Sequence, residues 1–465
     1  MMKWHQPVLK LAEKPKKFPW WVCIIIFVFA FCICFGFIFF NKVEEGNISS
    51  LIDFVTYLFF VPFIMALAIT FFVNCYYEII IFEYLVVDRF LESKKIAWKN
   101  WVNQGLYVIN SSYITPVADN AVKIMGLNDQ AQANSKRVLK IEYIDDSSQS
   151  RLIKIVEQLL TPMRNDLIKK RFYLNIEIYS THPKELTMNA LSIFCNKNDF
   201  AINIDEQVNI LSQEPDLNLI NNWIDDKKTE HLILSLNLHY EDNVDYSEFA
   251  TALLLSGSPK KQKEVYPKIH RMLETDLSHI EFDFALLLDS EQTDNQRIRH
   301  IWGVNMNDSG INTIITEIAE RNLPMEVNNL HRLDIYEGVV TSSHCLLAIA
   351  YACEAIKHGQ KAQIVGSQNQ DNIHLMQLDQ IDKQDIDGIN ERINYFPFNY
   401  FISIFLFFIG LCFLSQDLAI RKLSLIFTLI GGFLVAILLY LVFSIKRGFI
   451  ISKLEQDWSD EMDDD

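Results

Sequence analysis

Four long apolar runs constrain this sequence more than any other feature, because a helix needs about 20 apolar residues to cross a lipid bilayer. Residues 20–40 (WWVCIIIFVFAFCICFGFIFF) contain no charged residue. Further runs follow at about 54–77, 398–415 and 423–445. The first run is too long for the apolar part of a cleaved signal peptide, and a second run follows soon after it. We therefore expect four membrane-spanning helices, arranged as two hairpins.

Positive charges beside the apolar runs predict which side of the membrane the other residues occupy, because Lys and Arg are enriched in short cytosolic flanks. Such residues precede the first run and follow the second and the fourth (Lys3, Lys10, Lys14, Lys16 and Lys17; Arg89, Lys94, Lys95 and Lys99; Lys446 and Arg447). Arg421 and Lys422, between the third and fourth runs, are the exception. The composition, rich in Asn, Gln and Lys, is typical of a bacterial protein. We expect a multi-pass bacterial inner-membrane protein with both termini and the large middle region in the cytosol.

The middle of the chain is the only part long enough for a water-soluble core. Predicted strands there alternate with predicted helices, which is the pattern of a layered α/β domain. The strands are expected at 138–144, 171–179, 231–240, 248–255, 281–288, 299–306, 361–367 and 372–378, and the helices at 147–160, 259–274, 310–322 and 341–358. The strands also divide loosely into two halves.

These patterns predict six segments along the chain. They are a basic cytosolic N-terminus (1–19), a first membrane hairpin (20–82), a helical juxtamembrane segment (83–137), the cytosolic α/β domain (138–393), a second hairpin (394–445) and an acidic cytosolic tail (446–465). The acidic residues at 460–465 are expected to form a disordered, solubilising end.

Composition and motifs exclude several classes of function. The net charge of -16 argues against nucleic acid as a partner, because phosphate binding needs a basic face. The sequence contains no GxxxxGK[ST], GxGxxG, HExxH or GxSxG motif, and its eight cysteines form no CxxC pair. His231 and His239 lie at the two ends of a predicted strand, where solvated imidazoles are ordinary. We predict no cofactor and no metal site.

One segment nevertheless places reactive side chains at the start of a helix: LDIYEGVVTSSHCLLAIAYACEAIKHG, residues 333–359. Enzymes often expose a nucleophile in this position. His344 and Cys345 are neighbours in the sequence, however, and neighbours on a helix do not face each other. A Cys–His pair would therefore need a histidine from elsewhere, such as His331, His358 or His374. Cys345 and Cys195 remain the weak candidates for a nucleophile, against the simpler interpretation that a small-residue helix packs closely on a sheet.

The stretches EFATALLLSG, DFALLLD and residues 333–378 resemble the thiolase-like fold, in which a glycine-bearing loop opens a long small-residue helix and a β-hairpin follows. They resemble, more narrowly, membrane-anchored proteins encoded beside type VI secretion effectors, including the adaptor family of a type VI phospholipase effector. Thiolase-like enzymes use a cysteine at a helix start and histidines in glycine-rich loops. Here Cys195 has no such partner loop, and Gly338, Ser342 and Ser343 occupy the place of a glycine- and alanine-rich one. The resemblance thus implies the fold without its catalytic groups.

These observations lead to one expected function and two alternatives. We expect a non-enzymatic membrane protein whose cytosolic domain binds protein, as an accessory or adaptor of a type VI secretion effector. Its expected partners are the lipid bilayer and a secreted effector or toxin. The first alternative is an immunity protein that neutralises a membrane-acting, pore-forming toxin. The second is a membrane-bound acyl-transfer enzyme that uses Cys345 or Cys195.

Overall fold

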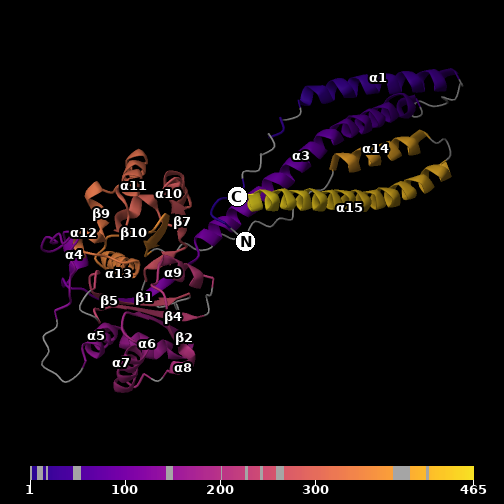
Figure 1. Ribbon diagram of the computed structural model, residues 1–465. Coiled ribbons are helices and arrows are strands. Elements are labelled where there is room, and N and C mark those ends of the chain that lie inside the picture. Colours follow the sequence, from indigo (N-terminus) through magenta and orange to yellow (C-terminus); the bar gives the residue numbers. More distant parts are fainter. Residues whose placement is uncertain are drawn as a thin grey trace. The chain divides into compact units, whose positions relative to one another are not determined.

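The computed structural model describes residues 3–7, 14–16, 19–44, 54–142, 150–200, 202–225, 229–240, 244–257, 266–380, 398–414 and 418–464. The chain divides into two compact units (Figure 1). One contains residues 1–97 and 387–465, and the other contains residues 98–386. Each is considered by itself.

The first unit is made of long apolar helices. They are α1 (Trp20–Glu44), a π-helical turn (Thr56–Phe60), α3 (Val61–Val102, whose last turn belongs to the second unit), α14 (Phe398–Leu414) and α15 (Leu418–Asp464). Among the described residues, three helices are long and apolar enough to cross a membrane: Trp20–Phe40, Leu58–Val102 and Ile430–Glu461.

Four spanning helices were expected, but the third, predicted at 398–415, is too short to be one of them. Helix α14 has only 17 residues, and its described apolar part is Phe398–Gly410. At about 1.5 Å per residue it is shorter than a hydrocarbon core of about 30 Å. The tail was also expected to be disordered, whereas α15 continues through the acidic residues to Asp464.

Contacts between the helices of this unit are mostly apolar. Phe82 of α3 meets Phe443 of α15 edge to face, and the Ser403 hydroxyl of α14 donates to the Ala68 carbonyl of α3 at 2.9 Å. Lys446 pairs with Glu83 at 2.6 Å. A largely apolar helix surface with few polar links is what a lipid surrounding favours.

The second unit is a layered α/β domain, as the sequence predicts. Its strands are β1 (Gly105–Ile114), β2 (Leu174–Ser180), β3 (Val208–Ile210), β4 (Glu230–Asn237), β5 (Phe249–Ser256), β6 (Lys268–His270), β7 (Leu273–Asp276), β8 (Ile298–Val304), β9 (Leu330–Arg332), β10 (Ala362–Asn369) and β11 (Asn372–Asp379). Its helices are α4 (Asn120–Ile124), α5 (Arg151–Leu160), α6 (Arg164–Lys170), α7 (Lys184–Lys197), α8 (Ile204–Gln207), α9 (Leu217–Trp223), α10 (Ile280–Asp289), α11 (Asp308–Glu320), α12 (Leu333–Tyr336) and α13 (His344–Lys357).

The strands repeat one arrangement twice. The order is β3-β2-β4-β5-β1 in the first half and β9-β8-β10-β11-β6 in the second, with β1 paired to β6 where the halves join. With β7 set aside, both halves have the strand order 3-2-4-5-1 when their strands are numbered along the chain. Across each half-sheet, in the order just given, the first three strands pair in parallel. The fourth strand pairs antiparallel with the third, and the fifth pairs antiparallel with the fourth. The two halves that the sequence suggested are therefore equivalent in topology.

Helix α13 lies between the two halves, with α5–α7 beyond the first half and α10 and α11 beyond the second (Figure 1). Alternating residues of β5 show how the layers form. Phe249 and Leu253 pack in the central core with α13, whereas Ala250 and Leu254 pack in the outer core with α5 and α7. A strand covered on both faces must be apolar at successive positions, which explains the continuous run FATALLLS.

Several predicted elements are corrected. Residues 83–137 are not helical throughout, because α3 ends at Val102 and β1 begins at Gly105, where it pairs with β5 and β6. Residues 281–288 form helix α10 rather than a strand, since Ile280, Phe284, Leu287 and Leu288 share a buried helical face. The predicted helix 259–274 contains β6 and the start of β7, and its first part lies outside the described residues. Residues 138–142 form no strand.

Candidate functional site

The two candidate nucleophiles lie in different cores. Cys345 is in the first turn of α13 in the central core, with no exposed surface, and its Sγ is 4.0 Å from the Pro215 carbonyl. Burial raises the pKa of Cys345 well above that of a free thiol, and the charges of Asp216 and Glu214 raise it further. Cys195 lies on α7 in the outer core, where burial raises its pKa to about 11. Neither side chain is a thiolate at neutral pH, and the thiolate is the nucleophilic form.

This burial predicts thiol reactivity directly. When the folded chain in detergent is treated with iodoacetamide at neutral pH, we expect no alkylation of Cys195 or Cys345 within minutes, because neither thiol is accessible or ionised. Both should be alkylated once the chain is unfolded in guanidinium, which serves as the control. Peptide mass spectrometry reads out each site separately. Rapid alkylation of Cys345 in the folded chain would show that the first turn of α13 opens.

His344 is engaged with its own turn and not with Cys345. The Thr341 N–H donates to His344 Nδ1 at 2.9 Å, and the imidazole lies against the Phe249 ring, with centroids 4.1 Å apart. Because Nδ1 is the acceptor, the neutral ring carries its proton on Nε2, which has no hydrogen-bond partner among the described residues. Burial lowers the pKa of His344 to about 3.

The other histidines considered as partners for Cys345 are also engaged elsewhere. The Nε2 atom of His331 lies 2.8 Å from Nδ1 of His300. His358 contacts Glu354, and His374 contacts Asn218. Burial, and then the neighbouring His300, lower the pKa of His331 to about 3.

Two neutral buried histidines make stability depend on pH. The pKa values of His331 and His344 are lower in the folded chain, about 3, than the ordinary 6.5, so the folded state binds fewer protons than the unfolded state. Stability therefore falls as the pH drops below 6.5 and continues to fall until about 3. At pH 5 each histidine should cost about 2 kcal/mol of unfolding free energy. The pH dependence of thermal unfolding tests this: His344→Asn should flatten it, whereas the exposed control His358→Asn should not. An unchanged slope in His344→Asn would contradict the assignment.

His231 and His239 do not form a metal site in the structure. His231 stacks on Trp223 with ring centroids 4.4 Å apart, and His239 Nε2 lies 2.6 Å from the Tyr246 carbonyl. In the described ranges no group of three or more His, Cys, Asp or Glu side chains could hold a metal ion.

What meets the start of α13 is a set of four polar side chains, here called the Glu214 cluster: Glu214, Asn237, Thr341 and Ser343. Glu214 Oε1 accepts hydrogen bonds from the Ser343 hydroxyl at 2.6 Å and from the Ser343 backbone N–H at 3.1 Å. Asn237 Nδ2 donates to the hydroxyls of both Ser343 and Thr341 at 3.0 Å. The first N–H groups of a helix have no partner within it, and a negative charge there is favourable. Glu214 thus caps α13 from a distant segment.

The cluster lies where the three parallel strands of the first half end. Asn237 is the last residue of β4, and Glu214 follows β3 by four positions. In parallel α/β sheets ligands bind outside the carboxyl ends of the strands. Neither Glu214 nor Asn237 is among the residues predicted from the sequence. The signal that could have found them is an amide and a carboxylate that follow two neighbouring apolar strands.

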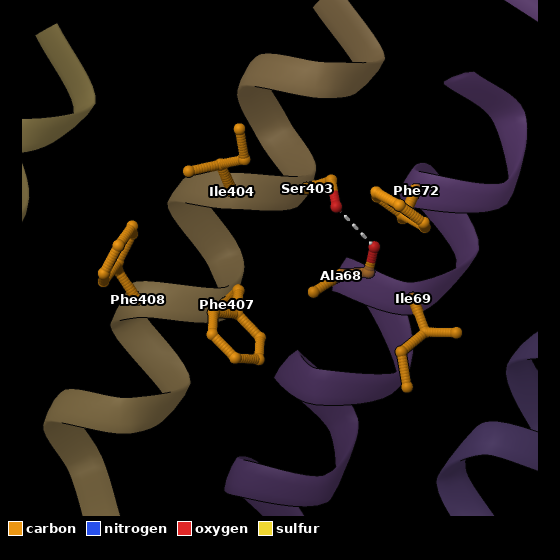
Figure 2. Close-up of a pocket in the computed structure, with 7 residues that line it drawn as sticks. All are labelled: Ala68, Ile69, Phe72, Ser403, Ile404, Phe407 and Phe408. Atoms are coloured by element: carbon orange, nitrogen blue, oxygen red, sulfur yellow. Dashed lines mark hydrogen bonds between the residues drawn. The ribbon is translucent and has the colours of Figure 1, made fainter. Parts of the chain in front are cut away.

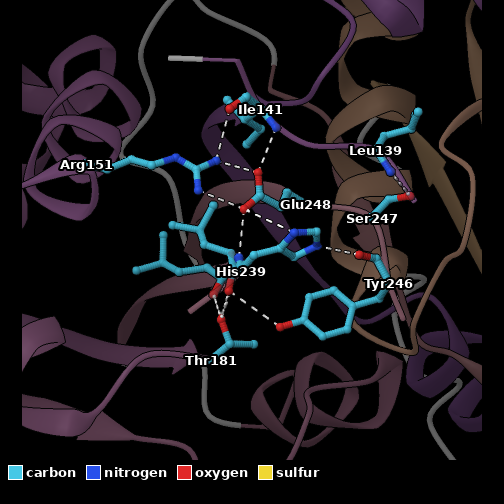
Figure 3. Close-up of polar contacts among 10 residues, drawn as sticks. Leu139, Ile141, Arg151, Thr181, His239, Tyr246, Ser247 and Glu248 are labelled. Atoms are coloured by element: carbon cyan, nitrogen blue, oxygen red, sulfur yellow. Dashed lines mark hydrogen bonds and ion pairs between the residues drawn. The ribbon is translucent and has the colours of Figure 1, made fainter. Parts of the chain in front are cut away.

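A second polar network, around Glu248, fastens the chain beside this edge (Figure 3). The Glu248 side chain has no exposed surface and accepts hydrogen bonds from the backbone N–H groups of Ile141 and His239, each at 2.7 Å. Arg151 of α5 binds both carboxylate oxygens. Burial alone would raise the pKa of Glu248, but its bonds to Arg151 and to the two N–H groups outweigh burial, and the pKa is lowered. The network acts as a structural clamp, because one buried carboxylate holds Ile141, Arg151 and His239 together.

In comparisons with known proteins, no family model and no curated protein matches this sequence. Solved structures do match. A chain of the AntDE:AntF complex, a type II polyketide synthase acyl-carrier protein with its ketosynthase, aligns with 60% of this chain and 99% of its own length, at 12% identity and a TM-score of 0.42. OleA of Xanthomonas campestris aligns with 59% of this chain and 98% of its own length, at 8% identity and a TM-score of 0.38. The tetronic acid condensing enzyme AbyA1 aligns with 59% and 99%, at 9% identity and a TM-score of 0.39. All three alignments have a TM-score below 0.5 and an identity of 12% or less, so they assign no family, no residue role and no activity to this chain.

Proposed function

We propose that this chain is a non-enzymatic, membrane-anchored protein whose α/β domain binds another protein. The observation that carries the proposal is the complete burial of the side chains that could act as nucleophiles at the start of α13. Ser343 and Cys345 have no exposed surface, and Ser343 is already bonded to Glu214. A nucleophile must reach its substrate and must be ionised or paired with a base. The second alternative from the sequence, an acyl-transfer enzyme, is therefore disfavoured.

The proposed anchor is the unit of long apolar helices, three of which have the length and composition of membrane spans. The proposed orientation, with the α/β domain in the cytosol, rests on the distribution of Lys and Arg beside these helices. The proposed partner, a secreted type VI effector, rests on the sequence resemblance to effector-associated membrane proteins.

The experiment compares the chain with its Cys195→Ala, Cys345→Ala double variant. Both are crosslinked in intact source cells and captured, and both are incubated, solubilised in detergent, with radiolabelled acetyl-CoA. We expect the same secreted protein on both chains in equal amounts, and no label on either chain. A covalent acyl label that disappears in the double variant would establish an enzyme and overturn the proposal.

A second candidate, immunity to a membrane-acting toxin, is favoured by one observation in the helical unit. A groove of about 390 Å³ lies between α3 and α14, lined by Ala68, Ile69, Phe72, Ser403, Ile404, Phe407 and Phe408 (Figure 2). The one hydroxyl in it, Ser403, already donates to Ala68, so the groove suits an apolar stretch of a toxin helix. Filling it with Ile69→Trp should abolish protection against such a toxin and leave capture of an effector unchanged. Protection that survives this substitution would remove the candidate.

A further inference from the structure

Two carboxylates at the carboxyl edge of the first half-sheet have no cationic partner. Glu214 and Asp216 flank Pro215 between β3 and α9, and both side chains are half-buried. Asp216 caps α9 through Asn218, and Glu214 caps α13 through Ser343. Neither takes part in an ion pair within the described part of the chain. Carboxylates withdrawn from water are usually paired with a positive charge, because desolvation without a counter-charge is costly.

A third acceptor at this edge also lacks a donor. Asn237 is 1% exposed, and its Nδ2 donates to Ser343 and Thr341, so its amide is directed into the Glu214 cluster. Its Oδ1 has no hydrogen-bond partner among the described residues. Buried amide oxygens are almost always bonded, and an orphaned one indicates a donor that arrives from elsewhere. Negative charge and a buried, unsatisfied acceptor therefore lie in the same cluster.

Two phenol rings belong to the same region. Burial and then the negative charge of Glu214 raise the pKa of Tyr179. Burial also raises the pKa of Tyr246, with smaller contributions from the charges of Glu248 and Glu214. Both tyrosines are half-buried.

We propose that Glu214 and Asp216, beside the buried Asn237 amide, form a receptor for an arginine side chain of the partner protein. The proposal rests on the protein-binding function proposed above and specifies the chemistry of the partner. A guanidinium offers five N–H donors in one plane, enough to reach Glu214 and a second acceptor at once. Glu214 is held ready by its bonds to Ser343, so little ordering is needed on binding. The net charge of -16 would also attract a basic partner.

The test uses the full chain in detergent and a capped Gly-Arg-Gly peptide as the probe, with the citrulline peptide as its neutral isostere. Titration calorimetry should show binding of the arginine peptide and at least about tenfold weaker binding of the citrulline peptide, because a charge-assisted pair is lost. Glu214→Gln keeps an oxygen for Ser343 but removes the charge, and should also weaken arginine binding about tenfold. The matched control, Glu206→Gln, changes an exposed carboxylate of the same unit and should have no effect.

Two outcomes overturn the proposal: equal affinities for the two peptides in the wild-type chain, or an unchanged arginine affinity in a folded Glu214→Gln variant. The wild-type comparison decides the matter if the variant does not fold. Neither outcome touches the proposed function, which fails separately if an acyl label forms on a cysteine. A chain can bind its partner without using this edge, so the two failures are distinguishable.

Discussion

Glu248→Ala should destabilise the α/β unit by about 3–5 kcal/mol, the range expected when one partner of a buried, hydrogen-bonded ion pair is removed. The substitution leaves the N–H groups of Ile141 and His239 without their acceptor and leaves the Arg151 guanidinium without its counter-charge. Thermal unfolding of the detergent-solubilised chain, followed by calorimetry, measures the loss.

The matched control for Glu248 is Glu157, another glutamate that pairs with a basic residue. Glu157 lies at the surface with Lys197, and its side chain is 28% exposed against 0% for Glu248. An exposed ion pair contributes only about 0–1 kcal/mol, so Glu157→Ala should shift the melting temperature little. Equal shifts for the two variants would show that the network in Figure 3 is not a clamp.

The Glu248 network also predicts a dependence on pH. Because the folded pKa of Glu248 is lowered, its contribution is present above the ordinary glutamate pKa and is lost as the pH falls through the folded value. This loss adds to that from the buried histidines but occurs at lower pH. Glu248→Gln should remove the acid part of the pH dependence and leave the part near pH 5–6, which is assigned to His331 and His344.

Gly338→Ala should cost about 3 kcal/mol, from the sum of a strained backbone and a steric clash. Gly338 has φ +80°, a region that residues with a side chain rarely adopt, and a Cβ there would lie 2.1 Å from the Arg137 carbonyl oxygen and 2.7 Å from Ser247 Oγ. The clash is with backbone, which cannot move without breaking the Val339 N–H bond to Arg137. The loop that leads into α13 should loosen as a result.

Gly359 provides the control, because it has almost the same φ, +82°, but nothing within 4 Å of its Cβ position. Gly359→Ala should therefore cost only the backbone term, about 1–2 kcal/mol. The difference between the two losses of unfolding free energy measures the steric clash of a Cβ at residue 338 with Arg137 and Ser247. Calorimetry on both variants gives this difference, and equal losses would show that the clash contributes nothing.

The long apolar helices and most of the strands could be predicted from the sequence, because each carries its signal within a few neighbouring residues. The strands β2, β4, β5, β8, β10 and β11 all lie where apolar, β-branched runs predicted them. The same reasoning gave a wrong prediction for residues 281–288, which form a helix and not a strand. EFDFALLL alternates like a strand and also has apolar residues at helical spacing, and only its packing selects the helix.

The sequence alone determined that the chain contains long apolar helices and that its middle forms a layered α/β domain, since hydrophobic patterning is a local property. The tertiary structure decided the candidate site. Glu214 and Ser343 are 129 residues apart in the chain and meet only because α9 and α13 both start at the carboxyl edge of one half-sheet. It also decided that His344 and Cys345 are both fully buried, because α13 packs between the two half-sheets and burial depends on residues far away in the sequence.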